Sequence, residues 1–258
     1  MPVADHVSSL SARLDAEVDA QRGFLIETTR TLVAVASPNP PGDVTECAEV
    51  ATGLLKAIDG VNITRYETAP GIVNLVAVMK GAGPGRRLVF NGHLDTFPIG
   101  EGYWTVPPLG GTLKDGRIYG RGVSDMKAGI AAALTAFRIL AGLRERWRGE
   151  LVMTLAGDEE NMGSLGSRWL LEHVPEAKGD AMLCGDVGSP MVLRFGEKGL
   201  CWVEIEAEGR PAHGAHVHKG TNAIDRLRQA LDGLKRLENL PVAAPADVTS
   251  AIMAAKPV

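Results

Sequence analysis

RRLVFNGHLDTFP, residues 86–98, holds an apolar strand and a polar site next to each other. Its apolar core, Leu88 to Phe90, is typical of a strand buried on both faces of a sheet. His93 and Asp95 follow directly after that strand. In α/β proteins, sites assemble in the loops that leave the carboxyl ends of strands. The stretch therefore predicts a buried strand with a candidate site at its end.

Further strands and helices alternate on both sides of this stretch. Period-2 and continuous apolar patterns predict strands, and apolar residues at helical spacing predict helices. The expected strands cover residues 62–67, 73–80, 150–157 and 181–185, and the expected helices cover 14–36, 44–58, 127–143 and 164–173. The first helix must stop at SPNPPG, residues 37–42, because its three prolines cannot continue a helix. This alternation predicts an α/β sandwich.

The pattern changes near Phe195, where a second and smaller domain is expected. Apolar and polar side chains alternate in GLCWVEIEAEG, residues 199–209, as in a strand with one solvent-exposed face. A helix is expected over residues 222–237. One strand and one helix cannot bury a core alone, and the last apolar run, 250–258, is cut off by the C-terminus. We therefore expect a catalytic domain over 1–194 and part of an α+β domain over 195–258.

Composition narrows the classes of function. The chain has 258 residues, of which 45% are hydrophobic and 22% charged, as in ordinary folded soluble proteins. With 27 basic and 31 acidic residues, its net charge of −4 gives no reason to expect nucleic acid or an anionic membrane as a partner. No run approaches the roughly 18 apolar residues of a membrane-spanning helix.

The three cysteines favour a reducing compartment. Cys47, Cys184 and Cys201 form no C-x-x-C pair, so neither a disulfide framework nor a cysteine zinc site is expected. Cys184 is expected to be a small buried apolar residue rather than a metal ligand. The first twenty residues contain four acids and lack the pattern of an export signal. We expect a cytoplasmic protein.

Three more acidic segments follow expected strands or precede an expected helix. Asp125 lies in GRGVSDMKAG, residues 120–129; Asp158, Glu159 and Glu160 lie in LAGDEENMG, residues 155–163; Asp186 lies in LCGDVGSP, residues 183–190. Taken singly, each segment has a simpler interpretation. His93 can be a strand-end histidine satisfied by Asp95, the three consecutive acids can be a solvated face, and capping of a helix is the favoured interpretation of Asp125.

Taken together, the four segments favour a dinuclear metal centre. Like charges at the end of a buried strand repel one another unless a cation lies among them or one keeps its proton. Two divalent ions need a bridging carboxylate, outer oxygen and nitrogen ligands, and a free carboxylate near the water to act as base. The chain offers all of these residue types, and Asp95 can fix the tautomer of a metal-binding His93.

The order of the motifs resembles the M20 metallopeptidase family, which includes deacetylases, desuccinylases and carboxypeptidases. The resemblance extends from about Leu25 onward and rests on HLDTFP, GRGVSDMKAG, DEE, GD, GRPAHGAH and KGTNAI in that order. It implies a zinc-exopeptidase-like α/β/α sandwich, followed by the start of a lid and dimerisation domain. It also implies two divalent metal ions, with zinc foremost and cobalt or manganese as alternatives.

The resemblance also assigns residues. His93 and Asp186 would bind one ion, Glu160 the other, and Asp125 would bridge both. Asp95 would orient His93. Glu159 would be the general base, and the peptide bond after Asp125 is often cis in this family. Asp186 is followed by Val187 where the family often has Glu-Pro, which leaves the ligand geometry at this position open.

In the smaller domain, the resemblance points to two residues. His213 would reach the active site of a partner subunit and stabilise the oxyanion, and Asn222 would lie near the substrate. A homodimer formed through the lid is therefore expected when the protein is full length. A separate local metal site of His213, His216 and His218 is the alternative.

Two functions remain. The first is a metal-dependent hydrolase that cleaves the amide bond of N-acyl amino acids or short peptides with a water activated by two metal ions. Which acyl-amino acid or peptide it would cleave is open. The second is a truncated, catalytically inactive homologue that at most binds metal or dimerises. The second function is motivated by a comparison with the family. Family members carry a final His ligand and the rest of the lid after the position that corresponds to Val258.

Overall fold

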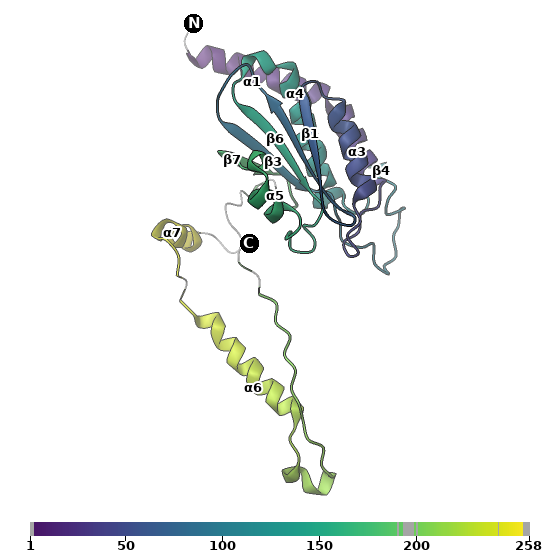
Figure 1. The fold of residues 1–258 in the computed structure, drawn as a ribbon, viewed down its shortest axis with the longest axis vertical. Coiled ribbons are helices and arrows are strands. Elements are labelled where there is room, and N and C mark those ends of the chain that lie inside the picture. The colour runs from purple at the N-terminus through teal and green to yellow at the C-terminus, as the bar shows by residue number, and fades with distance from the viewer. Residues whose placement is uncertain (1–2, 190, 193–198, 200, 242, 255–258) are drawn as a thin grey trace. The chain divides into compact units, whose positions relative to one another are not determined.

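The computed structural model describes residues 3–189, 191–192, 199, 201–241 and 243–254, which belong to two compact units. The first unit is Met1–Val192 and the second is Leu193–Val258 (Figure 1). The expected boundary between residues 194 and 195 lies outside the described residues.

A five-stranded mixed sheet forms the centre of the first unit. Its strands, in spatial order, are β1 (Val61–Ala69), β2 (Ile72–Lys80), β6 (Glu150–Ala156), β3 (Arg87–His93) and β7 (Ala181–Cys184). β1, β2 and β6 pair antiparallel, whereas β3 runs parallel to both β6 and β7. His93 pairs with Ala156, and Asn91 with Cys184. The loops after β3, β6 and β7 therefore leave the sheet at the same edge.

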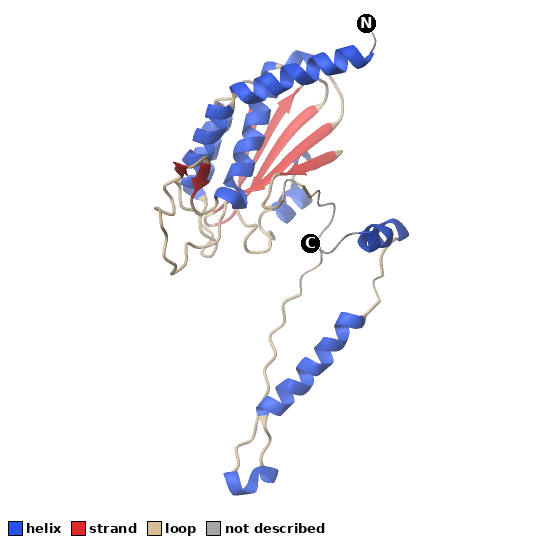
Figure 2. Ribbon diagram, turned by 180° about the vertical axis from the view of Figure 1, so that it is seen from behind, coloured by secondary structure: helices blue, strands red, loops and turns tan. Residues whose placement is uncertain are grey.

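Helices cover both faces of this sheet (Figure 2). On one face, the apolar sides of α2 (Arg22–Val33), α3 (Thr45–Lys56) and α4 (Ala128–Gly142) share a buried cluster with β2 and β6. On the other face, a second cluster joins the alternate residues of these strands to α5 (Ser167–His173) and the 3-10 turn η3 (Pro175–Ala177). The predicted α/β sandwich is confirmed, because strands with two apolar faces need a layer on each side.

The expected elements differ from the observed ones in two places of the first unit. The predicted helix over 14–36 is two helices, α1 (Val3–Ala20) and α2, separated at Gln21. A small hairpin of β4 (Thr112–Lys114) and β5 (Arg117–Tyr119) was not predicted. Its turn is Asp115–Gly116, both with positive φ (52° and 72°), as a tight hairpin turn requires.

β7 corrects an expectation about burial. The sequence AMLC is apolar, yet all four residues are exposed, and Cys184 is an exposed thiol rather than a buried one. The physical reason is position: β7 is an edge strand paired only with β3. No described helix covers it as α4 and α5 cover the inner strands.

The second unit has helices but no sheet in its described residues. The strand expected over 199–209 is not present in the described residues 201–209, because a strand needs a hydrogen-bonded neighbour and only the single bridge Arg210–Thr221 forms nearby. The expected helix over 222–237 is α6 (Ala223–Lys235), continued by the 3-10 turn η5 (Arg236–Asn239). α7 (Ala246–Ala254) takes up part of the last apolar run, whose residues 255–258 lie outside the described part.

None of the helices in the described part of the chain has both the length and the apolar character needed to cross a membrane.

Candidate metal centre

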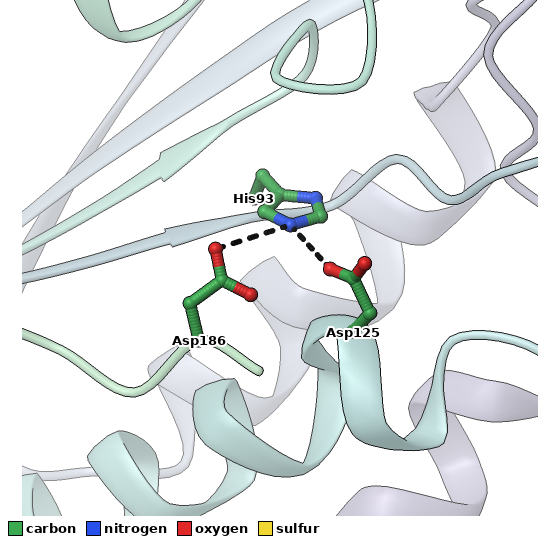
Figure 3. Close-up of side chains that lie close together, drawn as sticks. All are labelled: His93, Asp125 and Asp186. Atoms are coloured by element: carbon green, nitrogen blue, oxygen red, sulfur yellow. Dashed lines mark hydrogen bonds and ion pairs between the residues drawn. The ribbon is translucent and has the colours of Figure 1, made fainter. Parts of the chain in front are cut away.

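His93 is the centre of a group of carboxylates (Figure 3). It ends β3, its side chain is buried, and its Nε2 faces the loops after β6 and β7. The Nε2 atom lies 3.0 Å from Oδ1 of Asp125, 3.8 Å from Oε2 of Glu159 and 4.0 Å from Oδ2 of Asp186. Three segments far apart in sequence thus present oxygen atoms to one imidazole nitrogen.

Asp125 lies in a short π-helical turn, η1 (Val123–Lys127), that leads into α4. Neither η1 nor α4 has a side-chain cap hydrogen bond, so the capping interpretation of Asp125 is wrong. Its carboxylate is directed toward His93 instead. The peptide bond after Asp125 is cis, as the resemblance implied.

Asp95 connects His93 to the acidic loop. Its side chain is fully buried and accepts hydrogen bonds from the backbone N–H groups of Glu159 (3.2 Å) and Glu160 (2.9 Å) and from the Asn39 side chain (2.9 Å). The Nδ1 atom of His93 lies 2.9 Å from the carbonyl oxygen of Asp95 and 3.3 Å from its Oδ1. Both acceptors favour a proton on Nδ1, which leaves Nε2 free to bind a cation.

The three consecutive acids after β6 occupy different environments. Asp158 is buried, and its Oδ2 accepts the backbone N–H of Leu165 at 3.0 Å, so the interpretation of this run as a solvated face is wrong for Asp158. Glu159 is half exposed beside His93. The Oε1 atom of Glu160 accepts the backbone N–H of Phe97 at 2.9 Å.

The pKa values show an excess of negative charge. Burial lowers the pKa of His93, but the hydrogen bond and charge of Asp95, with the charges of Glu159 and Asp186, raise it to about 9. Burial and then the charge of Asp125 raise the pKa of Glu160 to about 7. Burial also raises the pKa values of Asp125 and Glu159. Without a cation the cluster must hold protons, and a divalent ion would replace them.

The ligand atoms of His93, Asp125 and Asp186 all lie within 4.8 Å of one another, so these residues can hold a metal ion. Glu160, the fourth expected ligand, is not in this group, although its pKa responds to the charge of Asp125. The structure therefore brings together three of the four expected ligands, with Asp95 and Glu159 beside them.

His213 and Asn222 belong to the second unit and have local contacts there. The Nδ1 atom of His213 accepts the backbone N–H of Ala215 at 3.2 Å, and Oδ1 of Asn222 caps α6 through the N–H of Ile224 at 2.9 Å. The rings of His213, His216 and His218 follow one another at 6.1 and 5.9 Å between centroids. In the described part of the chain, they do not form a three-ligand metal group.

Two buried polar residues beside the centre are not among the predicted site residues. Asn39 donates to Asp95, and Lys127 donates from Nζ to the carbonyl oxygen of Val35 at 2.7 Å. Burial lowers the pKa of Lys127, and the nearby Cys47 and Asp95 oppose this shift. The signal for Asn39 is a polar residue between prolines in SPNPPG, a segment whose prolines by themselves predict only the end of a helix.

Comparison with protein families finds a match over most of this chain. A family model described as peptidase family M20/M25/M40 matches residues 89–257, which include every expected site residue. The chain belongs to the M20/M25/M40 peptidase family.

Over the aligned residues, curated relatives are about a third identical to this chain. A succinyl-diaminopimelate desuccinylase of Ruegeria pomeroyi is 32% identical over 74% of this chain and 54% of its own length. An N-formyl-4-amino-5-aminomethyl-2-methylpyrimidine deformylase of Halalkalibacterium halodurans is 30% identical over 89% of this chain and 56% of its own length. The chain thus spans about half the length of the curated relatives that it matches.

Solved structures support the fold. Human carnosine dipeptidase 1 superposes with a TM-score of 0.56 at 21% identity, over 66% of this chain and 39% of its own. A tripeptidase of Staphylococcus aureus gives a TM-score of 0.56 at 18% identity, over 81% of this chain and 56% of its own.

Proposed function

We propose that this protein is a metal-dependent hydrolase that cleaves the amide bond of N-acyl amino acids or short peptides. The observation that carries the proposal is the convergence of His93, Asp125 and Asp186, whose ligand atoms lie within 4.8 Å of one another at the carboxyl edge of the sheet. Sites in α/β proteins are commonly built at this edge.

The proposed centre would hold two divalent ions. His93 and Asp186 would bind the first ion, Glu160 the second, and Asp125 both. The raised pKa values of His93 and Glu160 support this assignment, because they indicate a cluster that lacks positive charge. Zinc is the first candidate. Cobalt and manganese are alternatives, because a site with one imidazole and several carboxylates discriminates poorly among these ions. When bound, the ions would polarise the substrate carbonyl and lower the pKa of water.

Glu159 is the proposed general base. Its carboxylate is half exposed and within reach of the ligand group, and its N–H donates to Asp95, which limits where the side chain can point. Burial raises its pKa, so it can accept a proton from the attacking water and release it to the leaving nitrogen. Asp95 would hold His93 in the metal-binding tautomer.

The proposal extends to the second unit and to the cellular setting. Residues 1–194 would be the catalytic domain and 195–258 part of a lid through which the full-length protein forms a homodimer. His213 would stabilise the oxyanion across that dimer, and Asn222 would contact the substrate. The cysteine pattern supports a cytoplasmic location.

The names of the relatives favour deacylation over peptide cleavage. One relative is named for removal of a succinyl group and the other for removal of a formyl group. Both names describe loss of a small acyl group from nitrogen. We therefore place N-acylated amino compounds first among the candidate substrates.

One observation favours a second function. Glu160 lies outside the three-ligand group, so the chain would bind one ion rather than two. A homologue with a single ion that binds metal or dimerises without catalysis would have this property.

A paired assay distinguishes the two functions. The purified chain is loaded with zinc and tested for release of free amine from N-succinyl and N-formyl amino acids and from dipeptides. The matched variant Glu159→Gln keeps the size of the side chain and removes the base. We expect equal zinc content and turnover reduced about 10²- to 10⁴-fold. Full turnover by the variant would contradict the role of Glu159, and zinc binding without any turnover would favour the second function.

A further inference from the structure

We propose that Asn39 is a positioning residue for the metal centre. Its side-chain amide links the carboxylate of Asp95 to that of Asp158 and so fixes the loop after β3 against the loop after β6. The inference rests on the metal centre proposed above. It adds to that centre a residue from the SPNPPG segment, 37–42, which carries none of the expected ligands.

The amide lies between two buried acids. Asp95 is 0% exposed, Asp158 is 2% exposed and Asn39 is 4% exposed. The Nδ2 atom of Asn39 donates to Oδ2 of Asp95 at 2.9 Å and to Oδ1 of Asp158 at 3.4 Å. Buried carboxylates need hydrogen-bond donors, and an Asn amide supplies two N–H groups without adding charge. A side chain without this donor would leave both acids with fewer partners.

The backbone aims this side chain. The N–H of Asn39 donates to the carbonyl of Thr96 at 2.9 Å, and the N–H of Thr96 donates to the carbonyl of Ser37 at 2.9 Å. Residues 37–39 are thus paired to the loop that carries Asp95. Gly42 lies against the Asn39 side chain. Its φ is +92°, and a Cβ at this position would lie 3.1 Å from Oδ1 of Asn39, so a larger residue would crowd the amide.

The effect of Asn39 reaches the ligands through Asp95. Oδ2 of Asp95 accepts from Asn39 and from the N–H of Glu160, while its Oδ1 lies beside Nδ1 of His93 and accepts the N–H of Glu159. Loss of the amide would leave Oδ2 of Asp95 with the N–H of Glu160 and remove one of the restraints on rotation of the carboxylate. Rotation would change the orientation of the His93 ring and of the acidic loop together. Removal of such supporting groups costs about 10- to 100-fold in metal affinity.

Cobalt titration of the purified chain tests this role. Asn39→Leu keeps the branched shape of the side chain, with a somewhat larger volume and no donor, and Asn39→Asp keeps the shape but replaces the donor with an acceptor. Ser37→Ala is the matched control, because it removes the buried hydrogen bond from Ser37 Oγ to the carbonyl of Leu94 (2.7 Å) without touching Asp95. The readouts are the cobalt Kd, the visible absorption spectrum of bound cobalt and the thermal unfolding midpoint.

We expect both Asn39 variants to bind cobalt about 10- to 100-fold more weakly and with a changed spectrum. Ser37→Ala should lower the unfolding midpoint while its Kd and spectrum stay those of the unchanged chain. A purely structural role of Asn39 would give the result of the control. Folded Asn39→Leu with unchanged Kd and spectrum would therefore overturn the inference.

A smaller substitution keeps the test decisive if both variants fail to fold. Asn39→Ser adds neither charge nor strain, and its short hydroxyl cannot reach both carboxylates. A folded Asn39→Ser chain should bind cobalt at least about 10-fold more weakly, and unchanged binding would overturn the inference. Failure of the unchanged chain to bind cobalt would instead contradict the proposed metal centre, so the two failures are distinguishable.

Discussion

The first unit buries its apolar side chains, whereas the second unit leaves them exposed. Phe137, Leu75 and Met153 in the first unit have almost no solvent-accessible surface, whereas Trp202 and Ile224 in the second are 83% and 75% exposed. In the described residues 201–241 and 243–254 no side chain is buried. Both segments contain regular apolar patterns, so a pattern alone does not produce a core. It needs a second apolar surface to pack against.

The candidate metal centre also combines buried and exposed side chains. His93 and Asp95 lie at the buried end of a central strand, whereas Asp125, Glu159 and Asp186 approach from the side that faces solvent. The buried residues fix geometry, and the partly exposed carboxylates remain accessible to ions from solvent.

The largest expected difference between the units is in stability. Phe137→Ala removes a fully buried ring that packs edge to face with Phe90, and should lower the free energy of unfolding by about 3–5 kcal/mol. Leu231→Ala on α6 removes a half-exposed side chain and should change it by less than about 0.5 kcal/mol. Urea unfolding followed by circular dichroism measures both. Equal losses would show that α6 has a packing partner in solution.

The two units should also differ in how much a histidine substitution weakens zinc binding. His93→Ala removes the only nitrogen ligand of the described group and should weaken zinc binding by more than about 100-fold, beyond the loss expected for a supporting residue. His213→Ala is the control in the second unit and should change the zinc Kd less than about twofold. Competition with a chromophoric chelator gives both values. A strong effect of His213→Ala would support the alternative site at His213, His216 and His218.

The pH dependence of metal binding follows from the protons that the ion displaces. The pKa of His93 is about 9 and that of Glu160 about 7 in the metal-free protein. Between pH 7 and 9, affinity should rise about tenfold per pH unit, because one proton leaves His93. Below pH 7, the slope should steepen as Glu160 becomes protonated. A flat profile from pH 7 to 9 would contradict a pKa of about 9 for His93 in the metal-free protein.

The same two groups make the metal-free protein less stable at high pH. The folded-state pKa of His93 lies above its ordinary 6.5, and that of Glu160 above its ordinary 4.5. Their stabilising contributions are therefore complete at low pH and are lost as the pH rises through about 7 and 9. Thermal unfolding in chelator should show this loss, and added zinc should reduce it.

The smallest expected change in the free energy of unfolding is at an exposed residue of the first unit, where it tests whether burial or location in that unit determines the loss. Val18 belongs to the first unit but is 56% exposed on α1. Val18→Ala should change the free energy of unfolding by less than about 0.5 kcal/mol, like Leu231→Ala and unlike Phe137→Ala. Urea unfolding again provides the measurement. A loss of several kcal/mol would mean that location in the first unit matters more than burial.

The sequence predicted the parts of the fold that depend on local pattern. Apolar runs located β2, β3 and β6, and the residues that follow the parallel strands β3, β6 and β7 share one edge of the sheet. The strand expected over 199–209 was wrong in its described part because pairing depends on a distant neighbour that the local pattern does not reveal. The exposure of Cys184 was missed for the same reason, since an apolar strand reads alike at the centre and at the edge.

The site was predicted as a set of residues rather than as a geometry. The sequence indicated His93, Asp125 and Asp186, and the structure brings them together. It could not indicate that Asn39, separated from Asp95 by more than fifty residues, donates to it, because that contact depends on how residues 37–39 pair with the loop after β3. The capping interpretation of Asp125 failed because the direction of a side chain at a helix start depends on the turn before it.

Anomalous X-ray diffraction at the zinc absorption edge, on crystals grown with zinc, tests the central claim most directly. We predict an anomalous peak within bonding distance of Nε2 of His93 and of carboxylate oxygens of Asp125 and Asp186. A peak only at the His213, His216 and His218 rings, or no peak beside His93 at saturating zinc, would contradict the account.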